Sequence, residues 1–166
     1  MTAIPRFIAL LMLFVLSQST ADAQLNNELL VPKDTIVVYE ISSLYGEGGR
    51  IKITADGGVT FESSTFLFDI LAIRARISQE ELKDLVGEFE RINYFSLSDE
   101  YNMDNGCPRA HYDSSSIRTS LTINGKSKSI DHYQACFDKD GRRFPAELNA
   151  LERRIETLVN LKWRYR

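Results

Sequence analysis

The sequence lacks an excess of positive charge, a membrane-length apolar run and any catalytic or cofactor motif. Its formal net charge is −3 and its charges are interspersed, so it offers no field that would collect nucleic acid or anionic lipid. Its N-terminal apolar run has ten residues, about half of what a membrane-spanning helix needs. No cysteine lies directly after that run, so the thiol expected for lipoprotein anchoring is missing there. We therefore expect no nucleic acid, no membrane insertion and no cofactor.

The first 23 residues have the layout of a secretory signal. Arg6 precedes the apolar run Phe7–Leu16, and a polar stretch then ends in Ala21-Asp22-Ala23. A charged region, an apolar region and a small-residue site in this order predict cleavage after Ala23. The mature protein is therefore expected in the periplasm or outside the cell.

The rest of the chain is predicted to form one domain. Residues 24–33 are polar with scattered leucines and carry Pro32, which predicts a loosely held N-terminal lead. The domain itself is predicted at 34–166, because a chain of this length can bury roughly two-thirds of the surface that it exposes when unfolded. No second domain is required.

The strongest local signal is a β-hairpin over Ser114–Tyr133 that turns on Asn124-Gly125. Both turn residues tolerate the positive φ that a tight primed turn requires. Further runs that are rich in Ile, Val and Phe, or that alternate with polar residues, predict more strands. These runs are Asp34–Ser42, Arg50–Ala55, Val59–Ser63 and a strand from about Ile70 to Ile77.

Two helices complete the predicted fold. Ser78 followed by Glu81 forms a capping box at the start of an amphipathic stretch, which predicts a helix near Ser78–Asn93. Apolar residues at helical spacing predict a second helix near Pro145–Leu161. Runs of strands joined by tight turns and followed by helices predict an α+β domain. We expect an antiparallel sheet of five or six strands with two helices packed on one face.

Two segments, Ile92–Tyr101 and Thr119–Tyr133, are similar to a bacterial family called domain of unknown function 6438. The chain resembles this family over roughly Thr35–Trp163, as a divergent member. Members often carry a Cys-rich, Pro-containing motif before the strand that here begins near Arg50, whereas this chain has Tyr45–Gly49 there without cysteine. The resemblance implies an exported α+β domain and brings no established activity.

The two cysteines, Cys107 and Cys136, are predicted to form a disulfide, because they are the only pair in a chain with an export signal. Extending the hairpin from its turn places Cys136 opposite Asp113. Pro108–Tyr112 must then fold back toward the hairpin. Two buried thiols, or an intermolecular bridge between exposed sulfurs, are the alternatives.

The residues His111, Asp113, Ser114–Ser116 and His132 permit a hydrolase hypothesis, in which His111 or His132 acts with a nearby serine. A nucleophilic serine needs a base within hydrogen-bond reach and an oxyanion hole, usually on a strained elbow such as G-x-S-x-G. No serine here lies in such an elbow. The alternative is a polar strand end with surface or capping histidines.

The segment at 136–147 imitates a calcium loop at four positions. Its first position, which needs a hard oxygen ligand, is Cys136, and Pro145 stands where the exiting helix would begin. A turn with solvated acids is the alternative. A zinc site lacks paired ligand spacing, so no metal is expected.

Four residues at the open end of the hairpin form a candidate binding patch: Tyr101, Arg109, Tyr112 and Tyr133. Tyr and Arg anchor partners because they bury a large area while keeping a polar group. The alternative is that these rings cover the sheet edge and the disulfide. We expect an exported, non-enzymatic domain with a binding or structural role, and an envelope or extracellular protein is the expected kind of partner.

Overall fold

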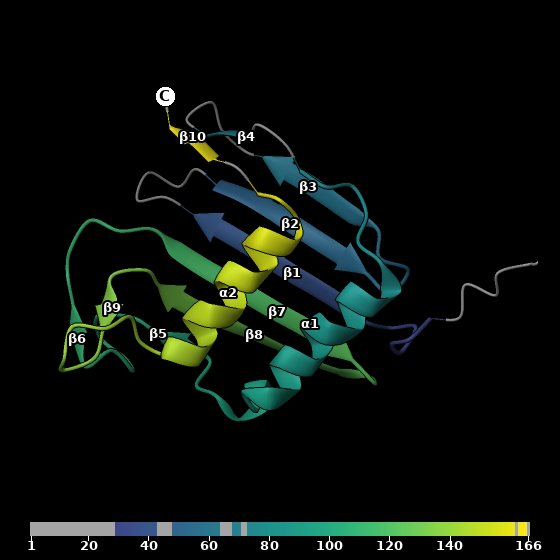
Figure 1. The fold of residues 1–166 in the computed structure, drawn as a ribbon. Helices are drawn as coiled ribbons and strands as arrows, with labels where there is room; N and C mark the ends of the chain where they lie inside the picture. Colours follow the sequence, from purple (N-terminus) through teal and green to yellow (C-terminus); the bar gives the residue numbers. More distant parts are fainter. Residues whose placement is uncertain (1–28, 43–47, 64–67, 71–72, 162, 166) are drawn as a thin grey trace, which may run out of the picture.

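The computed structural model describes residues 29–42, 48–63, 68–70, 73–161 and 163–165. The predicted signal peptide at 1–23 and the first half of the predicted lead, 24–28, lie outside these residues. A six-stranded sheet with the order β3-β2-β1-β7-β8-β5 forms the centre of the domain (Figure 1). Its strands are β1 (Ile36–Ser42), β2 (Gly48–Thr54), β3 (Val59–Ser63), β5 (Glu100–Tyr101), β7 (Ser116–Ile123) and β8 (Lys126–Tyr133).

Two helices, α1 (Gln79–Arg91) and α2 (Ala146–Leu158), lie side by side on one face of this sheet (Figure 1). A 3-10 turn, η1, follows α1 at Tyr94–Ser96. Two small antiparallel sheets join β4 (Phe68–Ile70) to β10 (Trp163–Tyr165) and β6 (Arg109–Ala110) to β9 (Cys136–Phe137). The predicted α+β fold is therefore confirmed. Among the described residues, no helix is long and apolar enough to cross a membrane.

One pair in the main sheet differs from the expected antiparallel arrangement. β5 pairs parallel to β8, with Tyr101 opposite His132. The chain reaches this edge after crossing the helical layer through α1 and η1, and such a crossover permits parallel pairing where a tight turn does not. The other pairs of the main sheet are antiparallel.

The predicted strand from Ile70 to Ile77 is wrong over most of its length. β4 ends at Ile70, and residues 71 and 72 lie outside the described part of the chain. From residue 73 onward the backbone makes separate bonds to different partners. Val59 N–H donates to Ala75, and Arg74 N–H donates to Val159. On the predicted apolar face Ile77 is buried and Ile73 is half-buried, but Ala75 is exposed. A ladder needs one neighbouring strand throughout, which this segment lacks.

The predicted helices are both present, and their starts follow from local chemistry. Ser78 caps α1, and the capping box with Glu81 is complete, because each side chain accepts the other residue's backbone N–H. Pro145 caps α2 from an extended conformation, and α2 ends at Leu158 rather than at Leu161. The apolar stripe of α1 is buried against the sheet at Leu82, Leu85, Val86 and Phe89.

A contact between residues far apart in the sequence holds the predicted hairpin turn. Asn124 and Gly125 have positive φ angles of 52° and 70°, as the turn requires. The two oxygens of the Asp34 carboxylate accept the N–H groups of Asn124 and Gly125 at 3.0 and 2.6 Å. These bonds lower the pKa of Asp34, with the Gly125 bond as the largest cause. The start of β1 is therefore fixed to the tip of the β7–β8 hairpin.

The ion pair at the start of α1 gives a pH-dependent prediction. Hydrogen bonds from Arg74 and from the Ser78 backbone lower the pKa of Glu81 from 4.5 to about 2. Because the folded pKa is depressed, this stabilisation is present above pH 4.5 and is lost as the pH falls through about 2. We expect Glu81→Gln to lower the urea midpoint of unfolding at pH 6 and to leave it nearly unchanged at pH 2. An equal difference at both pH values would contradict this origin.

Candidate functional site

Two of the four predicted patch residues lie inside the domain. The Tyr101 ring packs edge-on against His132 and Phe144, with ring centroids 6.5 and 5.9 Å apart. The Tyr133 hydroxyl donates to the His111 carbonyl at 2.9 Å and accepts the Ser114 N–H at 3.0 Å. Both tyrosines are buried, so they tie the loops to the sheet.

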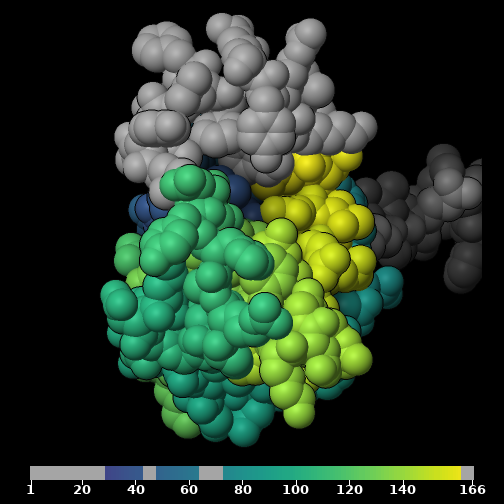
Figure 2. Space-filling model, turned by 90° about the vertical axis from the view of Figure 1, so that its left-hand side faces the viewer, coloured from purple at the N-terminus to yellow at the C-terminus, as the bar shows by residue number. Residues whose placement is uncertain are grey.

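The other two patch residues lie on the surface. Tyr112 is 81% exposed, and Arg109 is exposed with one guanidinium nitrogen 3.3 Å from the Lys139 carbonyl oxygen. The space-filling view shows the segment around 98–115 beside the segment around 135–145 on this side of the molecule (Figure 2). The role of these residues as a binding patch remains a prediction.

Cys107 and Cys136 are joined in a disulfide with their Cα atoms 5.5 Å apart. The expected register is wrong, because Cys136 pairs with Ala110 and not with Asp113. The hairpin ladder ends at the Ser116–Tyr133 pair, after which the chain leaves the main sheet and forms β9 against β6. Within Pro108–Tyr112, which we expected to fold back, Arg109 and Ala110 instead form the extended strand β6. The disulfide therefore joins the two loops at the open end of the hairpin.

The residues of the hydrolase hypothesis do not form one cluster. His132 lies buried under α2, whereas His111 is exposed and packs its ring against Phe137 at 5.2 Å. Within the described residues, no serine hydroxyl is hydrogen-bonded to either histidine. The contact that would activate a serine nucleophile is thus missing from the described part of the chain.

The segment at 136–147 contains a turn that is held by hydrogen bonds within the segment. The Asp138 carboxylate accepts the N–H groups of Asp140 and Arg142, both at 2.8 Å. Gly141 has a φ of +80°, which suits glycine at this turn. No group of three or more metal-ligating side chains occurs among the described residues.

The interface between α2 and the sheet holds a buried acid–base pair. His132 in β8 is 0% exposed and Glu152 in α2 is 2% exposed. The His132 Nδ1 atom lies 3.0 and 2.9 Å from the two Glu152 carboxylate oxygens, and Nε2 lies 3.1 Å from the Phe144 carbonyl oxygen. The carbonyl can only accept, so Nε2 carries a hydrogen, and one further proton is shared between Nδ1 and the carboxylate. Burial raises the pKa of Glu152, and the hydrogen bond and electrostatic attraction from His132 partly offset this increase.

A polar cavity of about 240 Å³ opens beside this pair. Its walls come from the start of β7, the residue that follows β8, the loop before α2, and α2 itself from Asn149 to Glu156. The residues that line it are Ile117, Gln134, Arg143, Asn149, Glu152, Arg153 and Glu156. Glu152 therefore pairs with His132 in the domain core and also lines a cavity at the surface.

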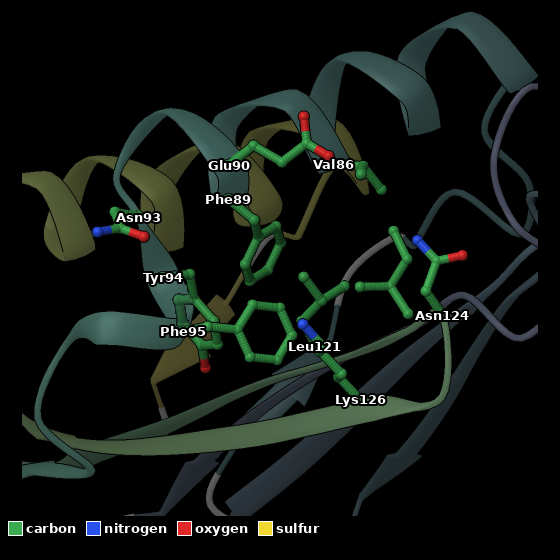
Figure 3. A pocket seen from close by; sticks show the side chains of 10 residues that line it. Val86, Phe89, Glu90, Asn93, Tyr94, Phe95, Leu121, Asn124 and Lys126 are labelled. Carbon is green, nitrogen blue, oxygen red and sulfur yellow. The ribbon is translucent and has the colours of Figure 1, made fainter.

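A second, mainly apolar pocket of about 360 Å³ lies between α1 and the tip of the β7–β8 hairpin. Phe89 from α1 and Leu121 from β7 form its interior and point toward one another (Figure 3). Phe95 lines it and remains 39% exposed, and its ring lies edge-on to the buried Tyr94 at 6.1 Å. Polar side chains accompany the apolar ones: Glu90, Asn93, Asn124 and Lys126. An apolar interior with a few polar groups is the usual composition of a ligand pocket.

Comparison with protein families assigns the chain to a family. A family model described as domain of unknown function (DUF6438) matches residues 48–159, which is more than half of the sequence. The chain belongs to the DUF6438 family. No curated protein and no solved structure matches the chain significantly.

The functional features of this DUF6438 domain could not all be found in its sequence. The sequence indicates His132 as a candidate base, but its partner Glu152 lies twenty residues away on an ordinary amphipathic helix. One signal was available. Glu152 falls on the buried face of α2, next to Leu151 and three residues before Ile155. A carboxylate at such a position indicates a buried partner. The apolar pocket has no comparable signal.

Proposed function

We propose that this chain is an exported, non-enzymatic binding domain, located in the periplasm or secreted, that binds an envelope or extracellular protein. In this proposal the pocket between α1 and the β7–β8 hairpin receives one aromatic or branched side chain of the partner. The observation that carries the proposal is this open, mainly apolar pocket beside an exposed phenylalanine.

The size and walls of the pocket support a single side chain as its occupant. Its volume of about 360 Å³ lies at the low end of the range for ligand pockets, which is about 300–1,000 Å³. Phe95 is exposed at the same site, and aromatic residues are enriched at protein interfaces. Glu90 and Lys126 carry opposite charges beside the apolar interior, where they can bond the polar backbone of a bound segment.

Export is supported by independent features. The N-terminal residues have the order of a secretory signal, and the two cysteines are joined in a disulfide. Disulfides persist in oxidising compartments and are rare in the cytosol. Both features favour the periplasm or the cell exterior.

The pocket can be tested with side-chain analogues. We expect N-acetyl-tryptophanamide and N-acetyl-leucinamide to shift the methyl NMR signals of Val86, Leu121 and Ile123 in the mature protein. The methyl signals of Ile51, which is buried in β2 and does not line the pocket, serve as the internal control. Unchanged pocket methyls at millimolar analogue would refute the pocket as a side-chain site.

A partner can be tested with matched surface variants. We expect Phe95→Ser to weaken the captured complex with a purified envelope partner by about tenfold or more, as for an aromatic anchor. Met103→Ser is the control, because Met103 is also an exposed large apolar residue but does not line the pocket. Tyr112→Ser tests the loop patch in the same assay. A complex weakened only by Tyr112→Ser would move the binding surface to the loops and contradict the pocket.

A further inference from the structure

We propose that the polar cavity beside Glu152 binds the carboxylate group of a small organic acid. This site is separate from the apolar pocket, because the two cavities share no lining residue. They lie at opposite ends of β7, with Ile117 in the polar cavity and Leu121 in the apolar pocket.

Two arginines without carboxylate partners line this cavity. The Arg143 guanidinium lies over the Phe137 ring, 5.0 Å from its centroid, which leaves its N–H groups available at the edge of the plane. Arg153 makes one long bond, from Nε to the Asn149 carbonyl oxygen at 3.4 Å. Within the described residues neither guanidinium forms an ion pair. A guanidinium donates two parallel hydrogen bonds to a carboxylate, so both residues can receive this anion.

The acidic residues of the cavity are already engaged by the protein. Both Glu152 oxygens lie within hydrogen-bond distance of His132, and burial raises the pKa of this carboxyl. Glu156 accepts a hydrogen bond from the Tyr39 hydroxyl. With these carboxyl groups partnered and the arginines unpaired, the cavity favours an added negative charge.

Two side-chain amides add neutral donors. The Gln134 amide nitrogen lies 3.4 Å from a Glu152 oxygen, and the Asn149 amide nitrogen donates to the Pro145 carbonyl at 2.9 Å. Each amide nitrogen carries two hydrogens, so each retains one donor for a ligand. The cavity volume of about 240 Å³ is below the usual range for drug-sized ligands, which indicates a small acid.

The experiment is a titration of the folded, disulfide-bonded protein with succinate, followed by ¹⁵N NMR. We expect succinate to shift the side-chain amide signals of Gln134 and Asn149. Succinamide has nearly the same shape without charge and should leave these signals unchanged. We expect Arg143→Gln and Arg153→Gln each to weaken succinate binding about tenfold or more, as for a charged hydrogen-bonded contact. Arg142→Gln is the matched control, because Arg142 is exposed near Asp140 and does not line the cavity.

Each other outcome overturns the proposal. Unshifted amide signals at millimolar succinate would mean that the cavity binds no carboxylate of this class. Equal shifts with succinamide would mean that charge is not recognised. Sulfate that shifts the signals at the same concentration as succinate would indicate general anion attraction. Equal weakening by Arg142→Gln would show a charge effect of the whole surface.

Discussion

Replacement of Glu152 by leucine, with His132 left in place, is expected to lower the free energy of unfolding by about 3–5 kcal/mol. The change removes both acceptors of His132 Nδ1 and leaves a buried imidazole without a partner on that side. Thr119 and Gln134 also lose their contacts with the carboxylate, at 3.5 and 3.4 Å. An unpaired buried polar group costs its full desolvation free energy, which is why the loss exceeds that of an ordinary hydrogen bond.

The double variant His132→Leu with Glu152→Leu measures the interaction between the two side chains apart from the contribution of each residue alone. Removing both partners leaves no unpaired group between them, so we expect the double variant to be clearly more stable than Glu152→Leu alone. Urea denaturation followed by far-UV circular dichroism measures the wild type, the single variants Glu152→Leu and His132→Leu, and the double variant. A double variant that loses the sum of the two single effects would show that His132 and Glu152 act independently.

The conservative variant Glu152→Gln tests the shared proton. Glutamine retains one acceptor oxygen for His132 Nδ1 but cannot accept or release the proton. We expect an intermediate loss of stability, smaller than that of Glu152→Leu. A loss as large as that of leucine would show that the charge of Glu152, and not its hydrogen bonding, holds the pair.

The second large effect is expected on opening the disulfide. The bridge joins Cys107 and Cys136, which are 29 residues apart in sequence. In the chain-entropy model, a loop of this length corresponds to roughly 3–4 kcal/mol of the free energy of unfolding. We therefore expect the Cys107→Ser, Cys136→Ser variant to unfold at a markedly lower urea concentration than the oxidised protein.

The reduced wild-type protein is the matched control for this variant. Both lack the covalent link, so their urea midpoints should agree, whereas disagreement would show that the serine hydroxyls themselves destabilise the buried position of Cys136. The unreduced protein should take up no alkylating reagent, because the structure leaves no free cysteine. Uptake of two equivalents without reduction would show that the native thiols are free.

Several parts of this fold could be predicted from the sequence because their causes are local. The hairpin turn requires only two residues that tolerate positive φ, Asn124 and Gly125. The start of α1 requires only Ser78 and Glu81 at capping-box spacing. The alternation of β7 indicates its buried face in the same way, although its Thr119 is as buried as its apolar neighbours.

The candidate site was less predictable, even where its residues had been recognised. Tyr101 and Tyr112 carry the same side chain in one polar stretch, yet the first is buried and the second is 81% exposed. Their difference comes from β5, which pairs with β8 and carries Tyr101 against His132. Sequence composition gives the residue types of a surface but not which of them another strand will cover.

The sequence by itself determined the local elements, the paired cysteines and the family of this protein. The tertiary structure alone decided the parallel edge strand, the contact of Asp34 with a turn ninety residues away, the His132–Glu152 pair and both cavities. Each of these depends on side chains that meet only after helices and strands have packed. Such long-range contacts follow no fixed spacing in the chain, because their geometry is set by the packing of the whole core.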